Sequence, residues 1–347
     1  MVNLLHTVPP AETIRPGAIG VTRLAWTALA INIVVILWGA VVRATGSGAG
    51  CGSHWPLCNG EVIPPSPSIG TLIEFSHRLS SGATLLVTAA LVWSVWKVFP
   101  RGHRARLGAA LCAVTMIVES LLGAGLVLLR LVAENQSIAR GWWVGAHLVN
   151  TLLLLGAFTM TAVWVSGTGV PAMPRSPGHA LRLAAVGAAL LCVIVTGSSG
   201  AITALGDTLF PPETLAIGLA QKDDPEAHPF VRLRLWHPTF AIATTIALAV
   251  SGPALATASA SRRASRLASV VTLLCLAQLG VGVLNVLLLA PVAMQLVHLA
   301  IADLIWISAV WMTLEAMAGF ARPVPETEEP ETGQTLRQEE PALSRSR

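Results

Sequence analysis

The chain has 347 residues, of which 54% are hydrophobic and 12% charged, and its mean hydropathy is +0.68. So few charged residues cannot cover the surface of a soluble protein of this length, so the composition excludes an ordinary soluble domain. The formal net charge of +4 would also suit a nucleic-acid-binding protein, but the Arg residues form short clusters between long apolar runs. The composition therefore predicts an all-α integral membrane protein that contacts lipid and no nucleic acid.

Eight apolar stretches are long enough to cross a membrane. The hydrocarbon core of a bilayer is about 30 Å thick, so a spanning helix needs roughly 20 apolar residues. The stretches that qualify are 20–42, 72–96, 107–129, 142–165, 181–203, 233–257, 267–289 and 293–316. The first stretch is too long for the core of a signal peptide, and we expect a retained helix there.

The charges between these stretches predict the orientation of the chain, because Lys and Arg collect in the short loops on the cytoplasmic side. Basic residues gather in the second, fourth and sixth connections: Lys97, Arg101, Arg104 and Arg106; Arg175 and Arg182; Arg262, Arg263 and Arg266. The long first connection, 43–71, has Arg43 as its one basic residue and should lie outside. Both termini are then cytoplasmic, and the Pro- and Glu-rich tail from Pro323 is predicted to be disordered.

The two halves of the sequence show a faint duplication. The stretch 107–129 contains LGAGLVLL from Leu122, and 267–289 contains LGVGVLNVLL from Leu279. In each half the next stretch places a His near its start, in AHLVNTLLL and VHLAIADLI. This order predicts two pseudo-symmetric four-helix bundles related as a parallel repeat. The expected units are a cytoplasmic segment 1–19, a bundle 20–166, a linker 167–180, a second bundle 181–317 and a tail 318–347.

Four histidines, His77, His147, His237 and His298, occur once in each even-numbered stretch. Each follows the predicted outer boundary by about five residues, which places it about 7 to 8 Å into the membrane. A single one of them could be a neutral side chain hydrogen-bonded between helices. Four at one depth favour metal ligands, because imidazole is the usual axial ligand of haem iron. Each half is therefore predicted to hold one haem between two imidazoles.

Other metal sites fit these residues less well. A Zn or Cu site would need four imidazoles around one ion, which two adjacent bundles hardly permit. A di-metal carboxylate site would need more than the one Glu-x-x-His motif, Glu74 with His77. Glu74 lies on the same helical face as His77. It suits equally a proton donor or acceptor and a structural ion pair with Arg78. The matching position in the second half is Arg234.

Six short motifs together resemble the haem A synthase family, membrane enzymes that oxidise haem O to haem A for terminal oxidases. The resemblance covers nearly all of residues 20–317. The motifs are GAVVRATGSGAGC at Gly39–Cys51, HWPLC at His54–Cys58, EFSHR at Glu74–Arg78, AHLVNT at Ala146–Thr151, WHP at Trp236–Pro238 and VHLAIAD at Val297–Asp303.

The resemblance implies an eight-helix fold with haem b as cofactor between His237 and His298. It implies haem O as substrate between His77 and His147, with Glu74 as the acid that takes part in oxidising a ring methyl group to a formyl group. An unidentified electron-transfer protein and the haem O synthase are the candidate partners. Near the outer face, Arg43 and Arg78 are candidate contacts for haem propionates.

Cys51 and Cys58 lie seven residues apart in the predicted outer loop, on the side of the membrane where disulfides persist. We expect a disulfide between them, with a structural and a redox role both open. Many relatives carry a second Cys pair between the fifth and sixth helices, whereas residues 204–232 contain no Cys here.

Two other functions remain as alternatives. A di-haem cytochrome, such as a quinone or ferric reductase, would carry electrons without modifying haem. A transporter would need helices broken at the membrane midplane, and Pro238 is predicted to lie in a first turn, where proline is tolerated. The remaining polar residues inside the spans are expected to form interhelical hydrogen bonds. They are Glu119, Asn150, Gln278, Asn285, Gln295 and Asp303.

Overall fold

The computed structural model describes residues 17–169, 172, 176–221 and 224–320, and within them the fold is helical throughout. The long helices are α1 (Ala18–Ala44), α2 (Ile69–Val98), α3 (Arg104–Leu128), α4 (Ile138–Val165), α5 (Pro177–Leu209), α7 (Pro229–Ala258), α8 (Arg262–Leu287) and α9 (Val292–Gly319). Two short helices, η1 (Ser47–Ala49) and α6 (Leu215–Gln221), lie in connections. Each long helix is long and apolar enough to cross a membrane, which confirms the eight predicted spans. The segment up to residue 16 and the tail predicted to be disordered lie outside the described residues.

The helices begin earlier than the apolar stretches predicted. Ser68, Ser137 and Ser176 each precede a helix and accept a hydrogen bond from the backbone N–H three residues later. The first turns after these caps include the polar residues Thr71, Arg140 and His179. A search for continuous apolar stretches therefore starts each helix too late. The largest difference is α5, which runs from Pro177 to Leu209 rather than over 181–203.

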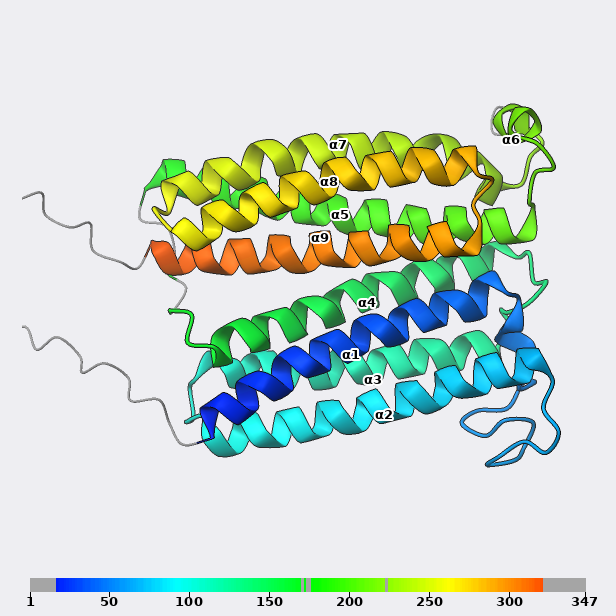
Figure 1. Cartoon of the computed structure of the whole chain (residues 1–347), viewed down its shortest axis with the longest axis horizontal. Helices are drawn as coiled ribbons and strands as arrows, with labels where there is room; N and C mark the ends of the chain where they lie inside the picture. Colours follow the sequence, from blue (N-terminus) through cyan, green and yellow to red (C-terminus); the bar gives the residue numbers. More distant parts are fainter. Residues whose placement is uncertain (1–16, 170–171, 173–175, 222–223, 321–347) are drawn as a thin grey trace, which may run out of the picture.

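The long helices form two groups of four. Figure 1 shows α1 to α4 in one group and α5, α7, α8 and α9 in the other, with their axes running along the same direction. The closest packing is between α3 and α4, between α5 and α7, and between α8 and α9. Helix α4 packs against α1, α3, α5 and α9, so it lies at the boundary between the groups. The two groups match the two expected bundles, while the internal duplication stays a prediction.

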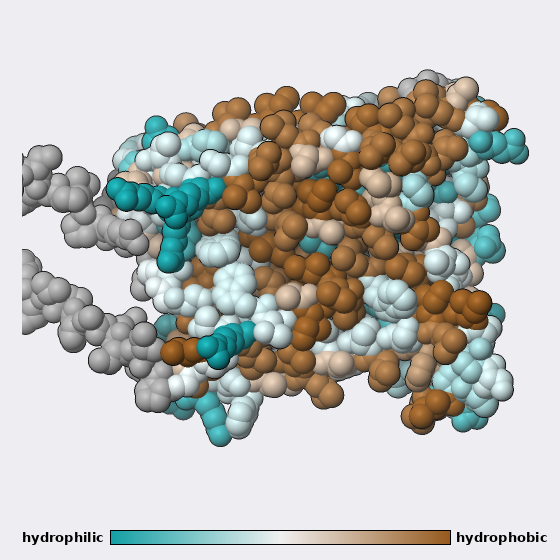
Figure 2. Space-filling view, viewed as in Figure 1, coloured by the Kyte–Doolittle hydropathy of each residue, from teal (hydrophilic) through white to brown (hydrophobic). Residues whose placement is uncertain are grey.

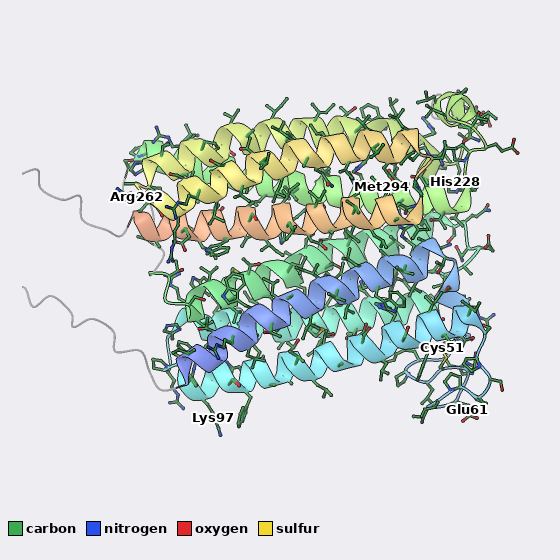
Figure 3. All side chains as sticks on the ribbon, viewed as in Figure 1. Cys51, Glu61, Lys97, His228, Arg262 and Met294 are labelled. Atoms are coloured by element: carbon green, nitrogen blue, oxygen red, sulfur yellow. A yellow bond between two sulfur atoms is a disulfide. The ribbon has the colours of Figure 1, made fainter. Side chains whose placement is uncertain are left out.

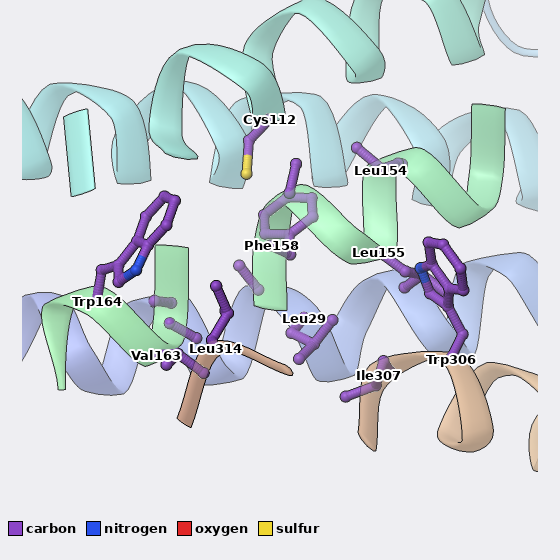
Figure 4. Packing of buried hydrophobic residues seen from close by; sticks show 14 of the residues in the cluster. Leu29, Cys112, Leu154, Leu155, Phe158, Val163, Trp164, Trp306, Ile307 and Leu314 are labelled. Atoms are coloured by element: carbon purple, nitrogen blue, oxygen red, sulfur yellow. The ribbon is translucent and has the colours of Figure 1, made fainter. Parts of the chain in front are cut away.

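One cluster of buried side chains joins the two groups. It contains Phe158 of α4, Leu29 of α1, Cys112 of α3 and Trp306 of α9, which Figure 4 shows around the middle of α4. The indole Nε1 of Trp306 also donates a 2.6 Å hydrogen bond to the carbonyl of Leu152 in α4. The groups therefore share a continuous core.

The outer surface is apolar around the middle of the molecule. Figure 2 shows a broad hydrophobic band between two more hydrophilic ends. Lys97 and Arg262 lie at one end, whereas Cys51, Glu61 and His228 lie at the other (Figure 3). This distribution is that of a multi-pass membrane protein, because lipid accepts apolar side chains where water would not. We call the end that carries Cys51 the disulfide end.

The prediction for Pro238 was wrong. His228 caps α7, which therefore begins at Pro229 and carries Pro238 inside the helix rather than in its first turn. Helix α7 continues unbroken to Ala258. The broken helix that a transporter would need is therefore not found at this proline.

Gly108 permits the close approach of α3 to α4. A Cβ atom at Gly108 would lie 2.5 Å from Oγ1 of Thr161 and 3.2 Å from its backbone nitrogen, whereas one at Gly123 of the same helix would have no neighbour within 4 Å. We expect Gly108→Ala to destabilise the protein by about 1–3 kcal/mol through overpacking. Gly123→Ala should be neutral or slightly stabilising, because Ala favours a helix more than Gly. Thermal unfolding of both variants in detergent measures the difference, and equal melting temperatures would contradict the expectation.

Candidate functional site

The four predicted histidines lie toward the disulfide end of the molecule. Helices α2, α4, α7 and α9 all begin at that end, and each histidine follows the first residue of its helix by six to nine residues. At 1.5 Å per residue they lie about 9–14 Å from the helix starts. This depth is similar for all four, and it exceeds the predicted depth because the helices begin earlier than expected.

His237 of α7 and His298 of α9 form a pair in the second group. Their ring centroids are 6.3 Å apart and their planes are inclined by 75°. A metal ion bonded to one nitrogen of each ring at about 2 Å would place the ring centres about 6 Å apart. The spacing of this pair therefore fits one iron ion between two imidazoles. Nδ1 of His298 has no hydrogen-bond partner among the described residues, whereas Nδ1 of His237 lies 3.2 Å from the hydroxyl of Ser199.

His77 of α2 and His147 of α4 are the corresponding residues in the first group. Nδ1 of His77 is buried and has no hydrogen-bond partner among the described residues. Nδ1 of His147 lies 3.3 Å from Oε2 of Glu119 in α3. That separation suits an ion pair, but the ring is not aligned for a hydrogen bond. Nδ1 of His147 therefore faces a carboxylate, whereas Nδ1 of His77 has no such neighbour among the described residues.

Neighbouring helices leave space for these rings through glycine. A Cβ atom at Gly39 of α1 would lie 3.0 Å from Cε1 of His77, and one at Gly200 of α5 would lie 2.7 Å from Cε1 of His237. Gly282 of α8 lies beside the α9 imidazole in the same way, with a distance of 3.3 Å. The rings therefore occupy space that a side chain on the facing helix would take.

Glu74 is buried, and both its carboxylate oxygens have partners. Oε2 accepts a 2.8 Å hydrogen bond from the backbone N–H of Cys51, and Oε1 accepts from Nε (3.1 Å) and Nη2 (2.5 Å) of Arg78. Nη1 of Arg78 donates to the carbonyls of His54 and Leu57. The ion pair that the sequence left open is therefore formed, and together with the bond from Cys51 it holds the loop between α1 and α2 against α2.

Cys51 and Cys58 form the predicted disulfide within this loop, with their Cα atoms 4.4 Å apart. The backbone of Cys58 also pairs with that of Glu61 in an isolated antiparallel bridge. The disulfide closes the loop directly above the start of α2. Whether it has a redox role stays open.

Arg234 occupies the matching position in α7, three residues before His237. Like Glu74 it forms an ion pair and contacts a connection between helices, but here the residue at this position carries the positive charge. Its Nε donates a 2.7 Å hydrogen bond to Oδ1 of Asp207 in α5. Its Nη atoms donate to the side chain of Gln221 in α6 and to the carbonyl of Phe210. In both groups, the residue three positions before the histidine thus fastens the outer connection to the helices.

Arg43 joins the two groups at the disulfide end. Nη1 donates to the carbonyl of Ala204 and to Oγ1 of Thr208 in α5, and Nη2 donates to Oε1 of Gln295 in α9. Contacts of Arg43 and Arg78 with haem propionates stay predictions. The sequence offered Glu74 as a partner of Arg78, but it did not reveal the partners of Arg43.

Sequence reasoning gave Glu119 no role beyond hydrogen bonding between helices. Besides approaching His147, its Oε2 accepts a 2.7 Å hydrogen bond from the amide of Asn150, and its Oε1 accepts from the hydroxyl of Thr151. Asn150 and Thr151 follow His147 by three and four residues, so the three side chains share a face of α4. That spacing within AHLVNT, opposite a lone Glu in an apolar stretch, was the available signal.

No group of three or more His, Cys, Asp or Glu side chains within the described residues is placed to hold a metal ion. Pairs of imidazoles suit instead a metal that brings most of its ligands with it. Haem iron is such a metal, because the porphyrin supplies four nitrogens and the protein the axial ligands. The residues present therefore fit haem.

Eight apolar helices define a multi-pass membrane protein, and each group of four helices carries two half-buried histidines toward one end. The comparisons with known proteins agree with this class. Residues 22–310 match the model of the COX15-CtaA family, described as "Cytochrome oxidase assembly protein", and the chain belongs to this family.

Proteins similar to this chain include ones with different names. The chain is 45% identical over 305 residues to the "Protoheme IX farnesyltransferase" of Thermus thermophilus, a match that covers 86% of the chain and 49% of the relative. It is 35% identical over 167 residues to the "Heme A synthase" of Halalkalibacterium halodurans, covering 48% and 54%. It is 44% identical over 108 residues to the "Heme A synthase" of Bacillus mycoides, covering 30% and 34%. The chain thus spans about half or less of the length of these curated relatives.

The role of Glu74 in holding the outer loop can be tested by proteolysis. Glu74→Ala leaves Arg78 and the N–H of Cys51 without their carboxylate partner. Because breaking a buried ion pair costs about 3–5 kcal/mol, cleavage within the loop should accelerate by at least about tenfold. Glu61→Ala is the matched control, since that side chain is exposed and its backbone bridge to Cys58 is kept. Similar cleavage rates for the two variants would exclude the proposed anchoring.

Proposed function

We propose that this protein is a haem A synthase, an oxidoreductase that converts a ring methyl group of haem O into a formyl group for terminal oxidase biogenesis. The observation that carries the proposal is the presence of two half-buried histidines in each group of four helices, in a chain of the COX15-CtaA family. Relatives named "Heme A synthase" support it.

The substrate site is assigned to the first group, with haem O between His77 and His147. The two sites are chemically unequal, which supports different roles. Nδ1 of His147 faces the carboxylate of Glu119, whereas Nδ1 of His237 faces the hydroxyl of Ser199. Electrons have to leave the substrate during oxidation, and a nearby negative charge favours the oxidised state of a haem site.

Haem b is the cofactor assigned to the second group. When bound between His237 and His298, it supplies one-electron redox chemistry close to the substrate. The residues of the chain hold and orient it: Gly200 gives the His237 ring its space, and the hydroxyl of Ser199 contacts Nδ1 of that ring.

The reaction is an oxidation that also needs proton transfer. Counted with water as the oxygen donor, a methyl group and two water molecules give a geminal diol, four protons and four electrons. The diol then loses one water molecule to leave the formyl group. Glu74 is the group we assign to proton handling, since its carboxylate lies one helical turn from His77 and contacts the outer loop. The electrons pass to a redox protein that remains to be identified.

The enzyme that makes haem O is the partner we propose for substrate supply. The Thermus relative is named for transfer of a farnesyl group to protohaem, and the matched region is only 49% of its length. The match covers 86% of this chain, whose residues 22–310 match the COX15-CtaA family. This relative shares a long region with the chain and is named a farnesyltransferase. That combination supports our proposal that haem O synthesis and its oxidation to haem A occur in sequence.

The proposed orientation places both haem sites near the outer face of the cell membrane and both termini in the cytoplasm. Lys97 and Arg262 lie at the end opposite the disulfide, and basic residues favour the cytoplasmic side. The disulfide of Cys51 and Cys58 suits the oxidising side.

Pigment extraction tests the proposed reaction. The protein should be expressed together with a source of haem O, purified and analysed for haem A. We expect haem A from the unaltered chain and at least a tenfold loss with His77→Ala. Glu74→Gln keeps an acceptor for Cys51 and Arg78 but cannot take up a proton, so it should keep its bound haem b and lose haem A formation. Two haems that stay unmodified throughout turnover with an electron acceptor would support the di-haem cytochrome instead.

The glycine beside His237 gives a separate test of the cofactor site. Gly200→Ala forces a displacement of the His237 ring, because its Cβ atom would lie 2.7 Å from Cε1. The purified variant should lose most of its haem b absorbance. Gly187→Ala in the same helix, where a Cβ atom would have no neighbour within 4 Å, should keep it. Full haem b content in Gly200→Ala would contradict the assignment.

A further inference from the structure

Three side chains converge on Glu119, which lies inside α3 and among apolar helices. The amide of Asn150 donates to Oε2 at 2.7 Å and the hydroxyl of Thr151 donates to Oε1. Nδ1 of His147 lies 3.3 Å from Oε2. An ionised carboxylate can only accept hydrogen bonds. The nitrogen of His147 that faces Glu119, Nδ1, should therefore be the one that carries a proton.

The donors to Glu119 are themselves fixed by α3 and α4. The amide of Asn150 also donates to the carbonyl of Thr115 in α3 at 2.9 Å, and the hydroxyl of Thr151 lies 2.9 Å from the carbonyl of His147. The carboxylate is thus anchored to both helices, and its position beside the imidazole does not depend on the imidazole itself.

The second group lacks this arrangement. Leu122 and Leu279 open the matching LGAG and LGVG segments, so Leu276 occupies the position that corresponds to Glu119. Nδ1 of His298 has no hydrogen-bond partner within the described part of the chain. The carboxylate is therefore a feature of the first site alone.

From this contact we infer that Glu119 is a positioning residue for His147. It holds the proton on Nδ1, so that Nε2 is left to bind the iron of the substrate haem. A small rotation of the ring aligns Nδ1–H with Oε2. This inference rests on the proposed function, because it takes the first site as the site of haem O.

The negative charge of Glu119 would also change the reduction potential of the iron held by His147. A carboxylate hydrogen-bonded to a ligating imidazole makes that ligand more basic. A more basic ligand stabilises ferric over ferrous iron and lowers the reduction potential. Glu119 therefore gives the first site a lower potential than the same imidazole pair would have without it, and the second site is unaffected.

Redox titration of the full-length protein, loaded with haem O and haem b, tests the inference through the potential of each haem. In Glu119→Gln, the ferric-to-ferrous ratio of the first site at a fixed potential should fall by at least tenfold, which is about 59 mV for a one-electron couple. The potential of the second site should stay unchanged and serve as the internal check of folding. Glu119→Asp should restore part of the shift, because it keeps the charge.

Ser120→Ala is the matched control. It alters the next residue of α3, whose hydroxyl donates to the carbonyl of Met116 in the same helix. The inference is overturned if haem O stays bound in Glu119→Gln and its potential differs from wild type no more than that of Ser120→Ala. If the unaltered protein binds no haem in the first site, the proposed function fails before Glu119 is tested.

Discussion

Polar groups inside a bilayer have no water to bind, so each has to find a partner within the protein or in a ligand. This constraint explains the arrangement at the disulfide end. The carboxylate of Glu74 is matched by Arg78 and a backbone N–H, and Arg234 by Asp207. Some buried polar atoms have no hydrogen-bond partner among the described residues, including Nδ1 of His77, Nδ1 of His298 and both carboxylate oxygens of Asp303. In the proposed function, the imidazoles among these groups hold haem.

The two helix groups use the same plan with different chemistry. In both, the residue three positions before a histidine fastens the outer connection, through Glu74 in one group and Arg234 in the other. In both, a glycine of the first helix lies against that histidine. They differ in what faces Nδ1 of one histidine in each group, a carboxylate at His147 of α4 and a hydroxyl at His237 of α7. The proposed substrate site and the proposed cofactor site thus share a scaffold.

Helix α4 connects these sites to the rest of the molecule. It carries His147, and most of its residues from Asn150 to Val165 are buried. This part of α4 packs against α1, α3, α5 and α9. Arg43 makes a second connection between the groups at the disulfide end. Because the two groups share this packing, the distance between their histidine pairs is fixed by the core rather than by a flexible linker.

The sequence alone determined the membrane class and the eight spans, because apolar length along a helix is a local property. It also predicted the disulfide, because Cys51 and Cys58 lie in one short loop. It left the role of Glu74 open and gave Glu119 only an expected hydrogen bond between helices. Only the tertiary structure decided that Glu74 accepts from the backbone of Cys51 as well as from Arg78, and that Glu119 meets His147. The contact of Glu119 with His147 depends on how α3 and α4 are rotated about their axes, and packing of the whole core sets that rotation.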